Sequence, residues 1–352
     1  TDYMIELLKA ILPYISGLYT LPWIVIGFVL TLLIAKFTGR EKIDNIMKKI
    51  GLILLYFFIP VLLFRIFIST TFGAKEIQFS LIVAFIILLM YLLAFFFAKY
   101  QIKKQKLSSK KETLYLKTML TNQGRSSAFI GSAMMAFWQL EAGIFMALVG
   151  IALFAIIPYI LSHLHKKERK EIDEAKNPLP WFLRLYPWYL ISFVLAAVLL
   201  HGPGGVTIDF NQPIPFLVKF YTAITIPAAL YYVGAGIHPS DLKLSEIKKL
   251  LGLESDKSDH WRWVRDMFIL TVLITPLVIG VIFGGLLSLG LISGAWFAVI
   301  FINAILPVTS TNMFLLPYGI DKRSTAHIVT WTTLVCVPIV IVLIMLFSYL
   351  FP

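Results

Sequence analysis

Long apolar runs recur along the whole 352-residue chain and leave few alternatives for its fold. A helix of about 20 apolar residues crosses the roughly 30 Å hydrocarbon layer of a bilayer. Hydrophobic residues make up 59% of the chain and charged residues only 14%, against about 25% charged residues in soluble domains. The sequence therefore predicts an all-α polytopic membrane protein. Ten transmembrane helices are predicted, near residues 16–36, 50–70, 78–99, 113–136, 140–163, 183–201, 214–237, 265–288, 294–317 and 325–350.

The N-terminal stretch leaves two alternatives open. Residues 4–36 are too long for one untilted span, and Pro13, Gly17 and Pro22 interrupt them. Residues 2–13 either belong to the first helix or lie as an amphipathic segment at the membrane interface. The number of predicted spans is the same in both cases.

The basic residues predict the orientation. Of the 31 lysines and arginines, twenty-six lie in or beside the loops that follow odd-numbered spans, whereas the loops after even-numbered spans contain only Lys75. Because positive residues accumulate in cytoplasmic loops, the odd loops are predicted to be cytoplasmic and both termini to lie outside the cell membrane. The net charge of +12 is thus a topology signal, and we expect no nucleic-acid partner.

Two features repeat at an interval of five spans. The second and seventh spans contain similar phrases, IPVLLF around Pro60 and IPAALY around Pro227, and the fourth and ninth contain polar clusters. The repeat predicts a first half over residues 1–163, a cytoplasmic linker over 164–182 and a second half over 183–352. Since five is odd, the second half enters the membrane in the opposite orientation, which is the inverted-repeat arrangement of many secondary transporters.

The fourth span carries a polar segment, TNQGRSSAFIGS, over residues 121–132. Arg125 lies ~18 Å into this span at 1.5 Å per residue, and an intramembrane arginine costs at least ~2.5–3.5 kcal/mol on insertion scales. Glu141 and Asp266 lie only at span edges, so no deep carboxylate is expected to pair with it. Arg125 therefore either contacts an anionic substrate, directly or through water, or ties helices together through carbonyls and hydroxyls.

The ninth span reads NAILPVTSTN over residues 303–312. Pro307 removes a backbone donor and should break the helix, freeing carbonyls and amides as ligands. The alternative is a simple proline kink with hydroxyls bonded back to the helix. Taken with the fourth span, we favour a binding site made by Asn122, Gln123, Arg125, Ser126, Ser127, Asn303, Pro307, Thr309, Ser310, Thr311 and Asn312. Helix breaks or hinges are predicted at Pro60, Gly124, Gly131, Pro227 and Pro307.

The remaining ionisable residues suggest no second site. Arg65 and Lys219 lie near span ends, where their side chains can snorkel to the interface. All six histidines are at span ends or in loops, and none has metal-ligand spacing to a Cys or carboxylate, so no metal site or other cofactor is expected. Ser126 and Ser127 lack an intramembrane His or Asp partner, which argues against an enzyme.

The sequence resembles the auxin efflux carrier family, within the bile acid:sodium symporter and auxin carrier superfamily. The resemblance covers nearly the whole chain and rests on the Pro60 and Pro227 phrases with Gly234 and Gly236, on RSSAFIG over residues 125–131, and on the segment from Asn303 through Pro307, Tyr318, Asp321, Thr332, Thr333 and Pro338. Many members have Asn and Thr where this chain has Ser127 and Ala128. The resemblance implies a ten-helix fold in which discontinuous helices 4 and 9 cross at the substrate site, elevator-like movement, homodimers and small organic-anion substrates.

We therefore expect a secondary transporter of a small mono- or dicarboxylate. Mid-membrane carboxylates are absent from the predicted spans, which disfavours proton coupling through such a group. Sodium coupling through the neutral oxygens of the fourth and ninth spans is an open alternative, as is an anion channel lined by the same residues. An intramembrane enzyme or receptor is the least favoured interpretation, since no catalytic pair is evident.

Overall fold

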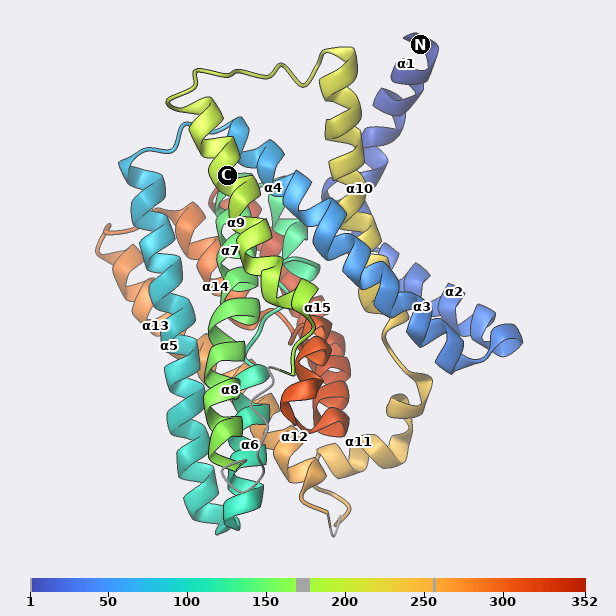
Figure 1. The fold of residues 1–352 in the computed structure, drawn as a ribbon, viewed down its shortest axis with the longest axis vertical. Coiled ribbons are helices and arrows are strands. Elements are labelled where there is room, and N and C mark those ends of the chain that lie inside the picture. The colour runs from blue at the N-terminus through green and yellow to red at the C-terminus, as the bar shows by residue number, and fades with distance from the viewer. Residues whose placement is uncertain (1, 169–177, 256–257) are drawn as a thin grey trace.

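The computed structural model describes residues 2–168, 178–255 and 258–352, which form helices joined by short connections (Figure 1). Within these residues the only β-type pairing is one bridge between Arg125 and Val308. The predicted all-α class is confirmed. The α-helices are α1 (Asp2–Ile11), α2 (Trp23–Thr38), α3 (Arg40–Ile53), α4 (Ile59–Ile68), α5 (Ala74–Gln105), α6 (Ser109–Thr121), α7 (Gln139–Ile151), α8 (Ile157–Glu168), α9 (Trp181–His201), α10 (Pro213–Ala235), α11 (Leu244–Leu250), α12 (His260–Phe268), α13 (Thr275–Ser288), α14 (Gly294–Ile305) and α15 (Lys322–Leu350).

Seven continuous helices within the described residues are long and apolar enough to cross a membrane, which indicates an integral membrane protein. They are Arg40–Ile68, Ala74–Gln105, Gln139–His165, Trp181–His201, Pro213–Ala235, His260–Ser288 and Lys322–Leu350. Two further apolar helices, Trp23–Thr38 and Gly294–Ile305, are shorter, and the predicted span near 113–136 is interrupted after α6. The count of ten spans and their inverted arrangement therefore stay predictions.

Three of the long helices in the described structure contain a widened, π-helical turn that ends two residues before a proline. Proline has no N–H, and its ring collides with the carbonyl four residues back in an α-helix. A π-turn, with bonds spanning five residues, relieves that collision without ending the helix. The three turns are η3 (Leu54–Phe58) before Pro60, η5 (Ala152–Ile156) before Pro158 and η8 (Ile269–Ile274) before Pro276.

The predicted helix breaks at Pro60 and Pro227 are wrong. The helix around Pro60 runs unbroken from Arg40 to Ile68, because η3 accommodates the proline. Pro227 lies inside the continuous α10, where packing against neighbouring helices offsets the one missing hydrogen bond. The role of these prolines as hinges remains a prediction.

Helices α2 and α10 pack with their backbones in contact. A methyl group at Gly27 would overlap the carbonyl oxygen of Tyr231, and one at Gly234 would overlap that of Ile24. Glycine at both positions is what allows this approach. In Figure 1, α2, α3 and α10 lie together on the right of the molecule, while α5 and α13 lie on the left.

The buried apolar residues form three separate clusters. The largest runs through α4, α5, α7, α9 and α14. A second joins the ends of α5 and α6 to α12 and α15, with the fully buried Trp261 and Tyr115 among its members. A small third cluster consists of Ile43 and Met47 of α3 with Ala235 of α10. The packing at the α3 and α10 ends is thus distinct from that of α12 and α15.

The N-terminal residues and the predicted linker can be placed in part. Helix α1 is separated from α2 by the two 3₁₀ turns η1 (Leu12–Ile15) and η2 (Gly17–Thr20), so residues 2–13 are not continuous with the first predicted span. Lys9 Nζ lies 5.9 Å from the ring centre of Phe216 on α10. Helix α8 extends to Glu168, inside the predicted linker, and residues 169–177 of that linker lie outside the described residues.

Candidate functional site

Two broken helices meet in the core. Helix α6 ends at Thr121, and helical structure resumes as a 3₁₀ segment, η4 (Ile130–Ala136). Helix α14 ends at Ile305, and the 3₁₀ segment η9 (Ser310–Tyr318) follows. The connecting segments, residues 122–129 and 306–309, pass each other antiparallel and are named the crossing.

Backbone hydrogen bonds join the two segments. The Ser126 N–H donates to the Pro307 carbonyl, and the Thr309 N–H donates to the Gly124 carbonyl, each over 2.9 Å. The Val308 N–H donates to Thr332 Oγ1 of α15 over 3.1 Å. We expected the amides freed by Pro307 to serve as ligands; for residues 308 and 309 that expectation is wrong, because the protein itself satisfies them, as buried backbone groups require.

Two glycines, one in the crossing and one just after it in η4, allow close packing here. A methyl group at Gly124 would lie 2.7 Å from Asn312 Oδ1 and 3.3 Å from a Leu153 methyl carbon. One at Gly131 would lie 3.0 Å from a Leu306 methyl carbon. The break of the fourth span therefore depends on small residues as well as on the loss of helical bonds.

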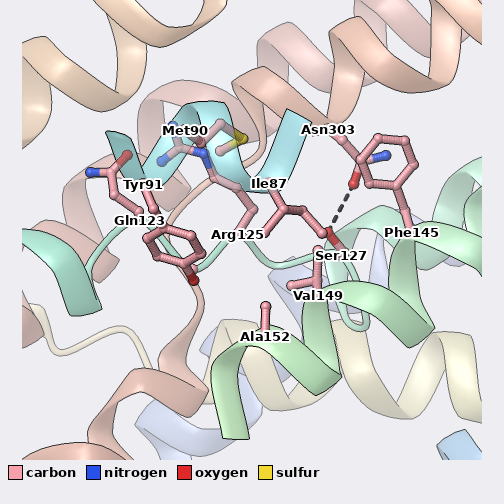
Figure 2. Close-up of a pocket in the computed structure, with 11 residues that line it drawn as sticks. Ile87, Met90, Tyr91, Gln123, Arg125, Ser127, Phe145, Val149, Ala152 and Asn303 are labelled. Carbon is pink, nitrogen blue, oxygen red and sulfur yellow. Dashed lines mark hydrogen bonds between the residues drawn. The ribbon is translucent and has the colours of Figure 1, made fainter. Parts of the chain in front are cut away.

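A small cavity lies beside the crossing, and Figure 2 shows its lining. It has room for about one water molecule in this conformation. An organic anion can enter only after the walls move apart. The lining residues are Ile87, Met90 and Tyr91 of α5, Gln123, Gly124, Arg125 and Ser127 of the crossing, Phe145 and Val149 of α7, Ala152 of η5 and Asn303 of α14.

Among the described residues that line this cavity, Arg125 is the only cation, and its side chain is almost fully buried at 3% exposure. Its Nη2 donates to the backbone carbonyl of Thr271 over 3.3 Å. Its Nε and Nη1 have no hydrogen-bond partner within the described parts of the chain. A buried guanidinium with unused donors is a costly arrangement that an anionic ligand would relieve.

The carbonyl that holds Arg125 is free because of a proline. In η8 the Thr275 N–H donates to the Leu270 carbonyl, five residues back. The next donor in this pattern would be residue 276, which would reach Thr271, but Pro276 has no N–H. The Thr271 carbonyl is thus left for Arg125.

Gln123 adds a second polar group to the cavity wall. It is 2% exposed, and neither Oε1 nor Nε2 has a hydrogen-bond partner among the residues that the structure describes. Across the cavity, Ser127 Oγ donates to Asn303 Oδ1 over 2.8 Å (Figure 2). Asn303 Nδ2 donates to the Val299 carbonyl over 2.9 Å. Ser127 and Asn303 therefore have partners of their own, whereas Arg125 and Gln123 have spare donors.

The other predicted site residues lie near the crossing but do not line this cavity. Ser126 and Ser310 line a second small cavity, together with Val308 and Thr330. Thr309 and Thr311 hydrogen-bond to each other through their hydroxyls over 2.9 Å. The predicted set thus divides into a part that faces the cavity and a part that holds the crossing together.

Asn122 and Asn312 belong to the second part. Asn122 Nδ2 donates to Thr325 Oγ1 of α15 over 3.1 Å. Asn312 Nδ2 donates to Asn122 Oδ1 over 3.4 Å. Both side chains are fully buried.

Sequence reasoning missed three groups that form or support the crossing and its cavity. Tyr91 lines the cavity from α5; a single tyrosine in the middle of an apolar span was the available signal. The Thr271 carbonyl has no signal in its own residue type, and only the following Pro276 points to it. Lys117 was grouped with a cytoplasmic loop, but it is 2% exposed and its Nζ donates to the Tyr318 carbonyl at the end of η9 over 3.1 Å.

Comparison with known proteins does not identify the chain. No protein-family model matches it, and no curated protein matches it. The functional conclusion therefore rests on the geometry of the crossing and its cavity.

Proposed function

We propose that this protein is a secondary transporter that carries a small organic anion, a mono- or dicarboxylate, across the membrane by alternating access. The observation that carries the proposal is Arg125, a buried cation with two spare donor atoms in a cavity at the crossing of two broken helices. A carboxylate pairs with a guanidinium through short, charge-assisted hydrogen bonds. Gln123 Nε2, also unpartnered within the described segments, supplies a further donor.

The lack of an internal counter-charge supports an anion as the ligand. Arg125 forms no salt bridge with a carboxylate in the portion of the chain that the structure describes. A carboxylate substrate would supply the missing negative charge. A neutral or cationic substrate would leave the guanidinium unpaired.

The crossing also supports a carrier rather than a channel. Two helix breaks of similar construction, each a helix, an extended segment and a 3₁₀ segment, meet antiparallel. We infer that they are equivalent parts of two inverted five-helix halves, as in other transporters with central binding sites. A cavity with room for about one water fits an occluded state. An elevator-like movement that separates the crossing from the α5 and α7 walls of the cavity would open it.

A binding experiment on purified protein tests the proposal. A panel of mono- and dicarboxylates is screened for an increase in melting temperature, because a ligand that binds the folded state stabilises it. An anion that stabilises the wild type should lose its effect in Arg125→Ala. Arg184→Ala is the matched control, since Arg184 is an exposed arginine on α9 and should leave the shift unchanged.

Transport separates the carrier from the channel. In proteoliposomes loaded with the same anion, a carrier gives saturable counterflow exchange, which Arg125→Ala should abolish. Single-channel currents without counterflow would favour the channel. Undiminished anion binding in Arg125→Ala would show that Arg125 is a structural tie and would overturn the proposed mechanism.

Sodium coupling is a second candidate because the crossing also holds buried oxygens. Thr121 Oγ1, Gln123 Oε1 and Asn312 Oδ1 have no hydrogen-bond partner in the described segments, and neutral oxygens are suitable ligands for a hard cation. Repeating the thermal-shift screen in sodium and in choline tests this. Sodium-dependent stabilisation that Asn312→Ala removes would favour the symporter, and equal shifts in both salts would exclude it.

A further inference from the structure

Two histidines that lie 67 residues apart in the sequence are in hydrogen-bond contact at one end of the bundle. His260 Nε2 of α12 lies 2.8 Å from His327 Nδ1 of α15. Both side chains are buried, at 9% and 8% exposure. The substrate cavity does not include either residue. The described residues contain no group of three or more ligands suited to a metal ion.

The partners at the two ends of this pair fix its protonation. His327 Nε2 lies 3.1 Å from Asp241 Oδ1. A carboxylate accepts, so His327 donates from Nε2 and, when neutral, accepts at Nδ1. His260 must then donate from Nε2 to His327.

The roles of His260 Nδ1 and the Ser324 hydroxyl follow from the same reasoning. With Nε2 of His260 protonated, its Nδ1 accepts, and the Ser324 hydroxyl 3.0 Å away donates to it. The series Ser324, His260, His327 and Asp241 is therefore complete with both rings neutral. Each nitrogen in it has a partner.

The same series accepts exactly one further proton without losing a bond. A proton added at His260 Nδ1 lets His260 pass its Nε2 proton to His327 Nδ1. His260 is again neutral, with its Nδ1–H now donating to Ser324, and His327 becomes an imidazolium that donates to Asp241. A second proton would put N–H groups on both facing nitrogens, 2.8 Å apart, and would break the contact.

The surroundings favour the cation. Asp321 Oδ2, on the residue that caps α15, lies 3.9 Å from His260 Nδ1. The Trp261 ring stacks on His327 with centroids 4.9 Å apart and 27° between planes, and an aromatic face attracts a cation. Burial is the largest single effect on the pKa of the Asp241 carboxyl and raises it, but the hydrogen bond and charge of His327, the charge of His238 and the hydrogen bond from Thr330 together lower it below its usual value. The carboxylate form is therefore the one held here.

The connection that follows α10 joins this series to another part of the molecule. His238, in the same connection as Asp241, lies with Nε2 3.2 Å from Asp44 Oδ2 of α3. Arg40 of α3 donates to Asp44 over 2.9 Å and to the Ala235 carbonyl over 2.6 Å. The charged and titratable groups that the described structure brings against the series are Arg40, Asp44, His238, Asp241 and Asp321.

Residues 235–241 therefore connect two of the hydrophobic clusters directly. On one side is the cluster of α3 and α10, and on the other the cluster that includes α12 and α15. Within α15, His327 is also close in sequence to Thr325 and Thr332, which bond to the two segments of the crossing. A change in the strength of the hydrogen bond between His327 and Asp241 therefore acts on the part of α15 that contacts the crossing.

We propose that His260 and His327 form a one-proton binding site that latches the connection after α10 to α15, and that proton binding tightens the latch and slows transport. An imidazolium adds the attraction between opposite charges to the hydrogen bond that the neutral imidazole already donates to the Asp241 carboxylate. Movement of α12 and α15 against α3 and α10 must stretch this bond. The effect on transport rests on the proposed function, whereas the latch itself does not.

Backbone hydrogen exchange tests the latch without any substrate. In purified protein, residues 236–243 should exchange more slowly at about pH 5.5 than at about pH 7.5, the range in which histidine side chains change charge, after correction for intrinsic rates. His327→Gln, which cannot take up the proton, should remove this difference. His201→Gln, at the end of α9, is the matched control and should keep it.

The transport assay supplies the second readout. The initial rate of anion counterflow should rise with pH on the side of the latch by up to about tenfold per pH unit, as control by one proton requires, and His327→Gln and His260→Gln should both flatten this profile. If neither variant folds, the difference in hydrogen exchange of wild-type residues 236–243 between the two pH values still tests the latch. Protection of residues 236–243 that is independent of pH, or that keeps its pH dependence in both variants, would overturn the latch. Absence of any anion transport, with the exchange difference present, would overturn only the proposed function.

Discussion

The Arg125 guanidinium donates from Nη2 to the backbone carbonyl of Thr271 over 3.3 Å. This carbonyl is available because the π-turn η8 directs it toward residue 276, which is proline. A widened helical turn, a missing N–H and a buried cation are thus parts of one arrangement. The same turn occurs before Pro60 and Pro158 without an arginine bonded to it in the described structure.

Replacing Pro276 should weaken the site without touching Arg125. In Pro276→Ala the new N–H competes for the Thr271 carbonyl, so Arg125 loses its orientation. A hydrogen bond to a charged group contributes about 1.5 kcal/mol or more, so anion affinity should fall about tenfold in an equilibrium binding assay. Pro158→Ala is the control, since it alters the same kind of turn in the helix formed by α7 and α8. Equal losses in both variants would mean that helix shape, and not the carbonyl, supports binding.

Lysine should not replace arginine at position 125. Arg125→Lys keeps the charge but presents a point charge in place of the planar fork that matches a carboxylate. Loss of one charge-assisted bond predicts affinity about tenfold or more below wild type, with residual binding above that of Arg125→Ala. Isothermal titration with a dicarboxylate that binds the wild type measures this. Wild-type affinity in Arg125→Lys would show that only charge is recognised.

A methyl group between α2 and α10 should destabilise the protein. Gly234→Ala places a carbon on the Ile24 carbonyl, and overpacking of this kind costs about 1–3 kcal/mol. The melting temperature should fall, and Gly27→Ala should act in the same way. In Gly285→Ala the added carbon meets no described atom within 4 Å, so this variant should melt like the wild type. A fall in Gly285→Ala equal to that in Gly234→Ala would refute the packing explanation.

Asp241 should make stability depend on acid pH. Burial, the largest single effect, raises its pKa, but the interactions with His327, His238 and Thr330 together bring the pKa below the usual 3.8. Its contribution to stability is therefore complete above pH 3.8 and is lost as the pH falls through the lowered value. Asp241→Asn should lower the melting temperature at neutral pH and reduce its dependence on acid pH. Glu254→Gln, at an exposed carboxylate, should leave the acid dependence unchanged; if Asp241→Asn also leaves it unchanged, the carboxylate does not stabilise the fold.

Much of the fold follows from local properties of the sequence. The apolar runs determine where helices form, since a chain in lipid must satisfy its backbone within each helix. The breaks near Gly124 and Pro307 also have a local cause, because glycine and proline lower the stability of the helix that contains them. The outcome at Pro60 and Pro227 differs because a π-turn or close packing can compensate a proline, and neither can be read from the proline itself.

The site was predicted only in its outline. Arg125 and Gln123 could be chosen from their polarity in an apolar span, but which of the predicted oxygens would face a cavity depended on the register between the two crossing segments. Tyr91 belongs to α5, and only the packing of α5 against the crossing brings its side chain to the cavity. Residues that meet only through tertiary structure carry no joint signal in a single sequence.

The sequence by itself determined that this protein is helical, that it is built for a membrane, and that a cation is buried in its fourth apolar run, because burial in lipid constrains residue type directly. Only the tertiary structure decided that Arg125 rests on the Thr271 carbonyl and that His260 meets His327. Hydrogen bonds have a range of about 3 Å, so partners far apart in the chain are set by how helices pack.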